Sequence, residues 1–493
     1  MKLLSKPLSE LLCALDSPMR DENAGDCRVL GVCDDSRRVQ AGDLFVAVPG
    51  SIDRAAQYAR AAVTAGAVAV VAPVALDLPV PTFVVDDARC ALAQLAAAFY
   101  GRPTADLLTV GVTGTNGKTS VCQFIAQLFG EQRTARIDTV ANATDDPEAL
   151  TTPTSPTIQR IAWEALQSGK THLVIEASSA GLAQHRLDQV AFDVAAFTNL
   201  SYEHMDVHGT EADYLRAKKT LFEGLATGGL AVINRDDAQA ESFRRATQAQ
   251  VTTYGFGDEA DVWASGVQSS GRSSAFTLGF RGITIPVTLQ VPGTFAVRNA
   301  LTAACVVLHH GVRLDELARR MPALRAPEGR TQGFKRAGRP DAVVDFAHNP
   351  DGLENVLGWL RQAYARVTVV FGCPGGSDRE KRIRMGVVAN RLADTIVITS
   401  DNPKSEAPEE IAADILLGID PGKATVVVDR SAAVDAAIRQ TAIDGVVLLA
   451  GKGHETVQKV GDRAIPYSDA RVLREAGYGE WANPETESKE RSA

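Results

Sequence analysis

Short apolar runs alternate along the chain with longer segments that repeat apolar residues at helical spacing. Near the N-terminus, the runs predict strands at residues 28–32, 43–48, 67–72 and 81–85, followed by a helix at 91–100. Gly101-Arg102-Pro103 then interrupts the pattern, as glycine and proline do between elements. Strands that alternate with helices are typical of βαβ units, in which helices cover both faces of a parallel sheet. The pattern therefore predicts an α/β fold.

The same rhythm continues through the middle and the end of the chain. Central strands are expected at residues 107–113, 173–177, 194–198 and 230–234, and each leads into a polar loop. Such loops form binding sites, because the carboxyl ends of parallel strands lie at one edge of the sheet. Runs at 276–280 and 283–287 flank Arg281-Gly282 and predict a hairpin. The last part predicts a second nucleotide-binding-type sheet, with strands at 342–346, 367–371, 395–399, 425–428 and 446–450.

The length of 493 residues exceeds what one hydrophobic core supports, and it predicts three domains. We place them at residues 1–103, 104–332 and 333–493. Hydrophobic residues make up 45% and charged residues 23% of the chain, as in ordinary globular proteins. The net charge of −9 argues against a nucleic-acid-binding surface.

No targeting signal or membrane span is expected. The N-terminus lacks an uninterrupted apolar segment, and the longest apolar stretch, at 61–81, contains Gly66 and Pro73. We therefore predict a cytoplasmic protein with no membrane partner. The seven cysteines form no CxxC pair and show no zinc-like spacing, so buried reduced thiols are expected.

The most specific local signal is the segment Gly111-Val112-Thr113-Gly114-Thr115-Asn116-Gly117-Lys118-Thr119. It follows a predicted strand and precedes a helical run at 120–129, which is the context of a phosphate-binding loop. Glycines let backbone N–H groups face the phosphates, Lys118 supplies a charge and Thr119 can bind Mg²⁺. The first glycine stands one residue earlier than in the usual spacing. A simple strand-to-helix turn is the weaker alternative, and the segment predicts ATP binding.

Two further side chains are expected beside this loop. Glu176 ends the strand at 173–177, and His204 follows the strand at 194–198. Mg²⁺ prefers oxygen ligands, so Glu176 is a natural ligand and the imidazole a less usual one. Taken alone, His204 is more simply a loop histidine.

Longer stretches around these residues resemble the Mur ligase family. They are Glu-Ala-Ser-Ser-Ala-Gly-Leu at 176–182, Phe-Asp-Val-Ala-Ala-Phe-Thr-Asn-Leu at 192–200, and the segment from Glu203 to Phe222. The resemblance implies a three-domain α/β architecture with a P-loop central domain and a Rossmann-like C-terminal domain. It also implies that Glu176 and His204 bind metal with Thr119. Lys218 stands where the family has a carbamylated lysine (N6-carboxylysine), which would hold a second Mg²⁺.

The resemblance covers nearly the whole chain and is greatest to the members that add a diamino acid to UDP-N-acetylmuramoyl-L-alanyl-D-glutamate. The N-terminal domain would bind the UDP end, with Asp35-Ser36-Arg37 matching the family segment. The implied contacts with the UDP-sugar-peptide are Ser36, Thr151, Thr152, Ser178 and Arg186. The implied ATP contacts are Gly114, Thr115, Asn116, Gly117, Lys118, Thr119, Asn299, Arg330 and Asp345.

The acceptor amino acid is predicted from a motif in the last domain. Members that take meso-diaminopimelate carry Asp-Asn-Pro-Arg, and this chain has Asp401-Asn402-Pro403-Lys404. Arginine can hold a carboxylate with two hydrogen bonds, whereas lysine acts as a point charge. Arg382, Gly451 and Glu455 also match, so diaminopimelate is preferred. L-lysine or L-ornithine stays open, as does a divergent ligase of another pathway, because Ala180, Phe346 and Asn349 depart from the family pattern.

The resemblance implies ligation through an acyl phosphate, with ATP and Mg²⁺ as cofactors, a hinge near residues 330–340 and a monomeric enzyme of peptidoglycan synthesis. Folylpolyglutamate synthase shares the loop and the fold, but Asp35-Ser36-Arg37 argues against it. An inactive regulatory nucleotide-binding module is the alternative from another class. The presence of Lys118, Glu176, His204 and Lys218 disfavours this alternative.

Overall fold

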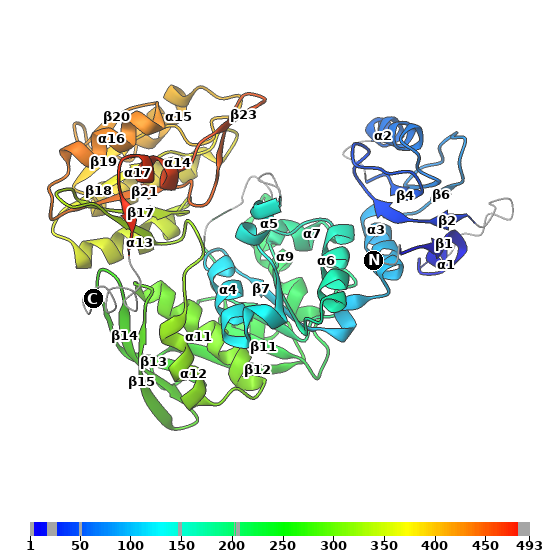
Figure 1. The fold of residues 1–493 in the computed structure, drawn as a ribbon, viewed down its shortest axis with the longest axis horizontal. Coiled ribbons are helices and arrows are strands. Elements are labelled where there is room, and N and C mark those ends of the chain that lie inside the picture. The colour runs from blue at the N-terminus through cyan, green and yellow to red at the C-terminus, as the bar shows by residue number, and fades with distance from the viewer. Residues whose placement is uncertain are drawn as a thin grey trace, which may run out of the picture.

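The computed structural model describes residues 4–16, 27–48, 52–145, 150–201, 203 and 208–481. Three bodies follow one another along the chain (Figure 1). The blue N-terminal body lies at one end, the cyan and green body in the middle, and the yellow-to-red body lies against the central one. The predicted α/β fold is confirmed, since parallel strands and helices alternate in each body.

The N-terminal body contains a parallel sheet of four strands. Their order is β3 (Gly31–Cys33), β4 (Asp43–Val46), β5 (Ala69–Ala72), β6 (Thr82–Val84). A small pair, β1 (Lys6–Pro7) and β2 (Arg28–Val29), and the helices α1 (Leu8–Leu12), α2 (Ile52–Thr64) and α3 (Ala88–Tyr100) complete it. The strand expected at 28–32 is two strands, because the chain turns at Leu30, which is exposed. Helix α3 ends at Gly101, whose φ of 77° suits glycine.

The central body is built on nine strands in the order β15-β14-β13-β12-β11-β10-β7-β9-β8. All pairs from β8 to β13 are parallel, and β14 and β15 form the predicted antiparallel hairpin. The strands are β7 (Leu108–Thr113), β8 (Thr134–Ile137), β9 (His172–Glu176), β10 (Val194–Phe197), β11 (Leu230–Asn234), β12 (Gln250–Phe256), β13 (Val262–Ser269), β14 (Ser274–Phe280) and β15 (Ile283–Leu289). The helices are α4 (Lys118–Phe129), α5 (Thr139–Asp145), α6 (Ser155–Gln167), α7 (Ser179–Ala183), α9 (Glu211–Glu223), α10 (Ala240–Arg244), α11 (Thr294–His309) and α12 (Leu314–Arg320).

Helices cover both faces of the parallel part of this sheet. Alternate residues of β10 point to opposite faces, so Val194 and Ala196 pack with α4 and α11 while Ala195 and Phe197 pack with α6 and α9. A strand that is buried on both sides must be apolar throughout, which is why the sequence shows a continuous run there. Short 3₁₀ turns, η1 (Pro103–Asp106), η2 (Glu131–Arg133) and η3 (Met321–Ala323), complete this body.

The C-terminal body has a seven-stranded sheet in the order β20-β19-β18-β21-β17-β16-β24. The strands are β16 (Gln332–Lys335), β17 (Asp341–Asp345), β18 (Val367–Phe371), β19 (Thr395–Ile398), β20 (Ala424–Val426), β21 (Val446–Ala450) and β24 (Gly479–Glu480), with a hairpin of β22 (Val457–Val460) and β23 (Arg463–Pro466). The helices are α13 (Pro350–Ala363), α14 (Arg379–Leu392), α15 (Pro408–Leu416), α16 (Arg430–Gln440) and α17 (Asp469–Glu475). The division between residues 332 and 333 stays a prediction, and it falls within β16.

Among the helices described, none is long and apolar enough to cross a bilayer. All seven cysteines are free thiols. The expectation of buried thiols is confirmed for Cys122, Cys305 and Cys373. It is wrong for Cys13, which is exposed, and for the half-buried Cys27, Cys33 and Cys90, because all four lie in the small N-terminal body, where much of the chain is near the surface.

Candidate active site

The phosphate loop connects β7 to α4 at the carboxyl edge of the central sheet. Gly114 has a φ of 143°, and a Cβ placed on it would lie 1.9 Å from Thr198 Oγ1. Gly117 has a φ of 89°, and a Cβ there would lie 2.4 Å from Asn299 Oδ1. Both positions therefore require glycine. The loop leaves the N-terminus of α4 facing outward, where its N–H groups and dipole favour an anion.

Lys118 begins α4 and stands between the loop and Glu176. Its Nζ donates to Thr115 O at 2.9 Å and lies 3.7 Å from Glu176 Oε1. The side chain is 15% exposed, so the ammonium is held in place but still reaches the open edge of the sheet. This position suits a charge that contacts a bound phosphate.

Oxygen donors gather around Glu176, which is 3% exposed. Its Oε2 accepts from Thr119 Oγ1 at 2.9 Å, from Thr139 Oγ1 at 3.0 Å and from Thr139 N at 3.1 Å. Carboxylate and hydroxyl oxygens in one place are what a hard cation such as Mg²⁺ binds. The residues therefore fit a magnesium ion.

Asp138 is a further carboxylate beside this cluster that the sequence analysis did not single out. It is fully buried, and burial raises its pKa. Its Oδ1 accepts from the backbone of Val140 and Ala141, while Oδ2 lies 3.5 Å from Arg136 Nε and accepts no hydrogen bond from the residues that are described. The available signal was its place directly after the run 134–137, which forms β8.

Lys218 lies behind the phosphate loop on α9 and is 1% exposed. Its Nζ donates to Gly114 O at 2.8 Å and lies 4.3 Å from the ring centroid of Tyr214. Burial, together with the positive charge of Lys118, lowers the pKa of this amine well below its usual range. His204 lies outside the described residues.

A cavity between the central and C-terminal bodies brings together five of the nine residues predicted to contact ATP. Asn116, Gly117, Asn299, Arg330 and Asp345 line it. Arg330 Nη2 donates to Thr119 Oγ1 at 3.3 Å. Asp345 accepts from Thr331 N at 2.6 Å and thereby fixes the segment that carries Arg330.

The residues predicted to contact the UDP-sugar-peptide lie next to the Glu176 cluster. Arg186 Nη1 donates to Thr152 O at 2.8 Å, and Thr152 Oγ1 donates to Ser178 Oγ at 2.9 Å. The Thr139 hydroxyl, which donates to Glu176, also lies within hydrogen-bond distance of Thr151 Oγ1, at 3.1 Å. Through Thr139, Thr151 is thus connected to Glu176 beside the phosphate loop.

The N-terminal body reaches this cluster through the loop that carries Ser36. Two residues earlier, Asp34 Oδ1 accepts from Thr154 Oγ1 of the central body at 3.3 Å. Burial raises the pKa of Asp34. Ser36 itself is half-buried. The structure therefore places Ser36 on the same side of the molecule as Thr151 and Thr152.

The residues predicted to bind the amino acid gather in the C-terminal body. Asn402 Nδ2 donates to Glu455 Oε2 at 2.9 Å, and the buried Lys452 Nζ donates to the same oxygen at 2.6 Å. Gly451 has a φ of 104°, and a Cβ there would lie 2.7 Å from Asp401 Oδ2. Burial raises the pKa of Asp401 to about 6. Lys452 is a member of this cluster that the sequence analysis did not assign.

Arg382 and Lys404 are placed differently from each other, although both are predicted to bind a carboxylate. The guanidinium of Arg382 is buried and holds both carboxylate oxygens of Glu406, at 2.6 and 2.7 Å. Lys404 is exposed, next to the buried Pro403, and its backbone is bonded to Lys459 O at 3.0 Å. Lys404 therefore lies in a more open region than the buried Arg382.

Known protein families and structures match this chain over most of its length. Residues 112–307 match the Mur ligase middle domain, and residues 329–453 match the Mur ligase, glutamate ligase domain. The chain is 39% identical over 456 residues to the UDP-N-acetylmuramoyl-L-alanyl-D-glutamate--2,6-diaminopimelate ligase of Geobacillus kaustophilus, covering 90% of this chain and 93% of that protein.

A second relative of the same description, from Halalkalibacterium halodurans, is 38% identical over 91% of this chain and 94% of its own length. A solved structure of a UDP-N-acetylmuramoyl-L-alanyl-D-glutamate--2,6-diaminopimelate ligase superimposes with a TM-score of 0.65 at 30% identity. The match covers 96% of this chain and 98% of that one. The similarity in sequence and the similarity in fold therefore both extend over all three bodies.

Proposed function

The chain belongs to the Mur ligase family, and we propose that it joins meso-2,6-diaminopimelate to the D-glutamate γ-carboxylate of UDP-N-acetylmuramoyl-L-alanyl-D-glutamate. It is an ATP-dependent amide ligase of peptidoglycan synthesis with the three-domain architecture of that family. The similarity to diaminopimelate-adding ligases extends over nearly the whole chain, and this single observation favours the function over the folate-directed alternative.

The reaction begins with transfer of the γ-phosphoryl group of ATP to a carboxylate oxygen of the bound substrate. The bond to ADP breaks, and an acyl phosphate forms. Catalysis of this step is mostly positioning and neutralisation of charge. The loop N–H groups and Lys118 lie where they can hold the phosphates, and Arg330 approaches from the C-terminal body to within 3.3 Å of Thr119 Oγ1.

The amine then attacks the acyl carbon, phosphate leaves with its oxygen, and the nitrogen loses a proton. The amine and the acyl phosphate must meet in the space between the central and C-terminal bodies. We place the distal end of the amino acid at Glu455 and Asn402, which are hydrogen-bonded to each other, and at Gly451, where a Cβ would crowd Asp401. The hinge at 330–340 connects the two bodies and would set their approach.

Mg²⁺ would be held by Thr119 and Glu176, with His204 and a carbamate on Lys218 as the expected further ligands. When bound, it neutralises the charge that develops on the phosphoryl oxygens. Asp138, whose Oδ2 has no hydrogen-bond donor among the described residues, adds negative charge to this pocket. Thr139 helps to orient Glu176 through two hydrogen bonds to Oε2.

The carbamate on Lys218 is supported by the state of the amine. Carbon dioxide reacts with neutral amines, and burial favours the neutral form of Lys218. The nitrogen attacks the carbon of CO₂ and releases one proton. The product is an anion, which can bind a metal ion where the unmodified ammonium would repel one.

The acceptor is proposed from the charges around the selector motif. The distal end of diaminopimelate carries an ammonium and a carboxylate. Glu455 supplies an acceptor for the ammonium, and Lys404 supplies the exposed cation for the carboxylate. Because Arg382 is paired with Glu406, we assign it the role of fixing that carboxylate in the site.

The direct experiment is to mix the enzyme, ATP and UDP-N-acetylmuramoyl-L-alanyl-D-glutamate with each candidate amine and to measure ADP release and product mass. The expected result is ADP release and amide formation with meso-diaminopimelate far above those with L-lysine or L-ornithine. Equal or faster ligation of L-lysine would contradict the proposed acceptor. ADP release with folate and glutamate in place of these substrates would contradict the proposed function.

A further inference from the structure

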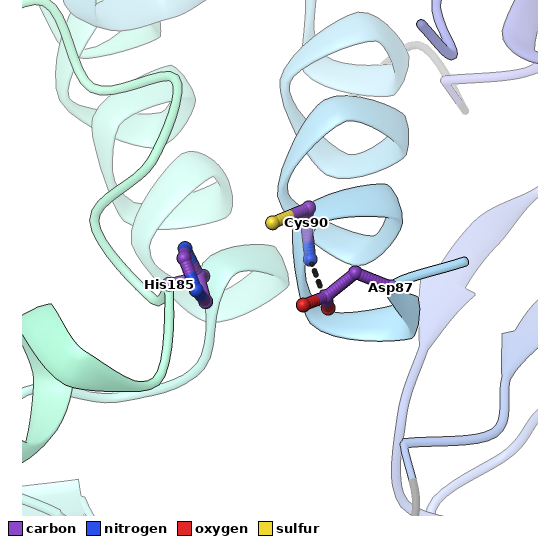
Figure 2. Close-up of side chains that lie close together, drawn as sticks. All are labelled: Asp87, Cys90 and His185. Carbon is purple, nitrogen blue, oxygen red and sulfur yellow. Dashed lines mark hydrogen bonds between the residues drawn. The ribbon is translucent and has the colours of Figure 1, made fainter. Parts of the chain in front are cut away.

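Three side chains of types that often bind metals lie close together where the N-terminal body meets the central body. Asp87 and Cys90 lie at the start of α3, and His185 follows α7 (Figure 2). One potential ligand atom from each of them lies within 4.8 Å of the other two. No other His, Cys, Asp or Glu group of this kind occurs in the described ranges of the chain.

Asp87 is held in place by the helix that it caps. Its Oδ1 accepts from Arg89 N at 2.7 Å and from Cys90 N at 3.1 Å. These bonds satisfy one carboxylate oxygen and leave Oδ2 for another partner. Because Cys90 lies three residues after this cap, its thiol and the carboxylate of Asp87 project from the same first turn of α3.

His185 is also oriented by a second residue. Its Nδ1 lies 2.8 Å from Oδ2 of Asp188. A carboxylate that accepts from one ring nitrogen and leaves the other free for a metal is the usual arrangement around zinc-bound histidine. The same oxygen of Asp188 lies 3.9 Å from Cys90 Sγ, so this carboxylate borders the cluster on the central body's side.

The surroundings of the thiol are negative. The carboxylates of Asp87, Asp188 and Asp16 are the charged groups that act on the Cys90 thiol. Arg89 partly offsets the charge of Asp87. A doubly charged cation placed between the three donors would relieve the mutual repulsion of these acidic groups.

We propose that Asp87, Cys90 and His185 form a binding site for a divalent transition metal, with zinc as the preferred ion. Sulfur, nitrogen and oxygen together are typical ligands for zinc, whereas Mg²⁺ takes oxygen ligands. Donor atoms around a tetrahedral zinc lie roughly 3.6 Å apart, given bonds of about 2.0–2.3 Å. The three donors lie within 4.8 Å of one another without an ion, and a bound ion would draw them closer, with water completing the coordination. Binding forms a sulfur–metal bond and releases the thiol proton of Cys90 to solvent.

The site has a structural consequence, because its ligands come from two bodies of the chain. A bound ion would fix α3 against the loop that follows α7. Arg186 is the next residue after His185, and its guanidinium donates to Thr152 O. The metal would therefore hold the UDP-sugar-binding body at a constant distance from the residues proposed to contact the peptide part of the substrate.

The test uses the full-length protein, freed of metal with a chelator and titrated with Co²⁺ in an excess of Mg²⁺. The expected result is one cobalt ion bound with a near-ultraviolet thiolate-to-cobalt charge-transfer band, which Zn²⁺ then removes by displacement. The band is expected to be absent in Cys90→Ser. In His185→Gln, the affinity for Co²⁺ is expected to be at least tenfold lower. Cys13→Ser, which removes an exposed thiol, is the matched control and should keep the band.

A second measurement distinguishes the loss of the metal ligand from misfolding of the variant. Zn²⁺ is expected to raise the thermal-unfolding midpoint of the parent and of Cys13→Ser, since it binds only the folded chain. The midpoint of folded Cys90→Ser, verified by circular dichroism, is expected not to move. A charge-transfer band that persists in Cys90→Ser, or a parent protein with no such band, would overturn the proposal. Neither readout depends on ligase activity.

Discussion

Lys381 Nζ, on α14 of the C-terminal body, donates to Glu203 Oε1 of the central body at 2.7 Å. The lysine side chain is 9% exposed and the glutamate 4%. Glu203 lies one residue before His204, so this ion pair joins the C-terminal body to the segment expected to hold metal. We expect this pair to hold the two bodies together in the arrangement that the structure shows, which is called closed below.

Lys381→Met is expected to destabilise the closed arrangement. Removing one partner of a buried ion pair leaves the other charge without compensation, which typically costs about 3–5 kcal/mol. We expect a lower kcat and a lower thermal-unfolding midpoint. The control is Arg384→Met on the same helix, whose pair with Glu380 is exposed and is worth roughly 0–1 kcal/mol. Equal effects of the two substitutions would contradict the assigned role.

Lys118→Ala is expected to abolish ADP formation with the preferred amine. The ammonium is hydrogen-bonded to the phosphate loop at Thr115 O, and loss of one preorganised group at a transition state lowers kcat by about 10²-fold or more. The measurement is steady-state ADP release with amide detected by mass. Lys219→Ala, next to Lys218 on α9, serves as the control and should retain activity. A parental rate in Lys118→Ala would end the proposal that this loop holds ATP.

The carbamate proposed on Lys218 can be tested directly. With ¹³C-bicarbonate, the parent is expected to show a carbamate carbon signal by NMR, and Lys218→Ala is expected to lose it. Because burial lowers the pKa of Lys218, a larger fraction of this amine is neutral, and can react with CO₂, than of an ordinary lysine at the same pH. Lys219→Ala should keep the signal. If the signal is the same in parent and Lys218→Ala, the modification lies elsewhere.

Lys404 is expected to control the choice of amino acid. Lys404→Ala should lower kcat/KM for meso-diaminopimelate by about 10–100-fold, because a hydrogen bond to a charged group contributes about 1.5–3 kcal/mol. The same substitution should leave the rate with L-lysine, which has no distal carboxylate, nearly unchanged. Lys404→Arg should preserve diaminopimelate selectivity through a two-point contact. Parallel losses with both amines would show that Lys404 acts on folding or closure instead.

The sequence was sufficient for features that depend on neighbouring residues. The loop at 114–117 requires positive φ at two glycines and lies between an apolar run and a helix, so its identity is encoded within a dozen residues. The strands at 230–234, 367–371 and 446–450 coincide with β11, β18 and β21 for the same reason, since a strand buried on both faces must be apolar throughout. Strand ends elsewhere differ by one to three residues, because turns there are set by contacts outside the strand.

The resemblance to a family supplied the roles of residues such as Lys218 and Thr151, and the structure places most of them in three clusters. It also gave Arg382 a role in carboxylate binding, which stays a prediction. Only the structure shows that Glu406 holds this guanidinium, since the two residues lie on separate elements. His204 remains a prediction, because it lies outside the described residues.

What the sequence alone determined is the α/β fold and the phosphate loop, because these follow from local backbone geometry and from the periodicity of apolar residues, whereas the kind of chemistry came from the resemblance to the Mur ligases. The tertiary structure decided the pairs between distant segments. Lys381 and Glu203 are 178 residues apart, and Cys90 and Asp188 are 98 apart. Their contacts depend on how whole bodies pack, and no spacing along the chain encodes that packing.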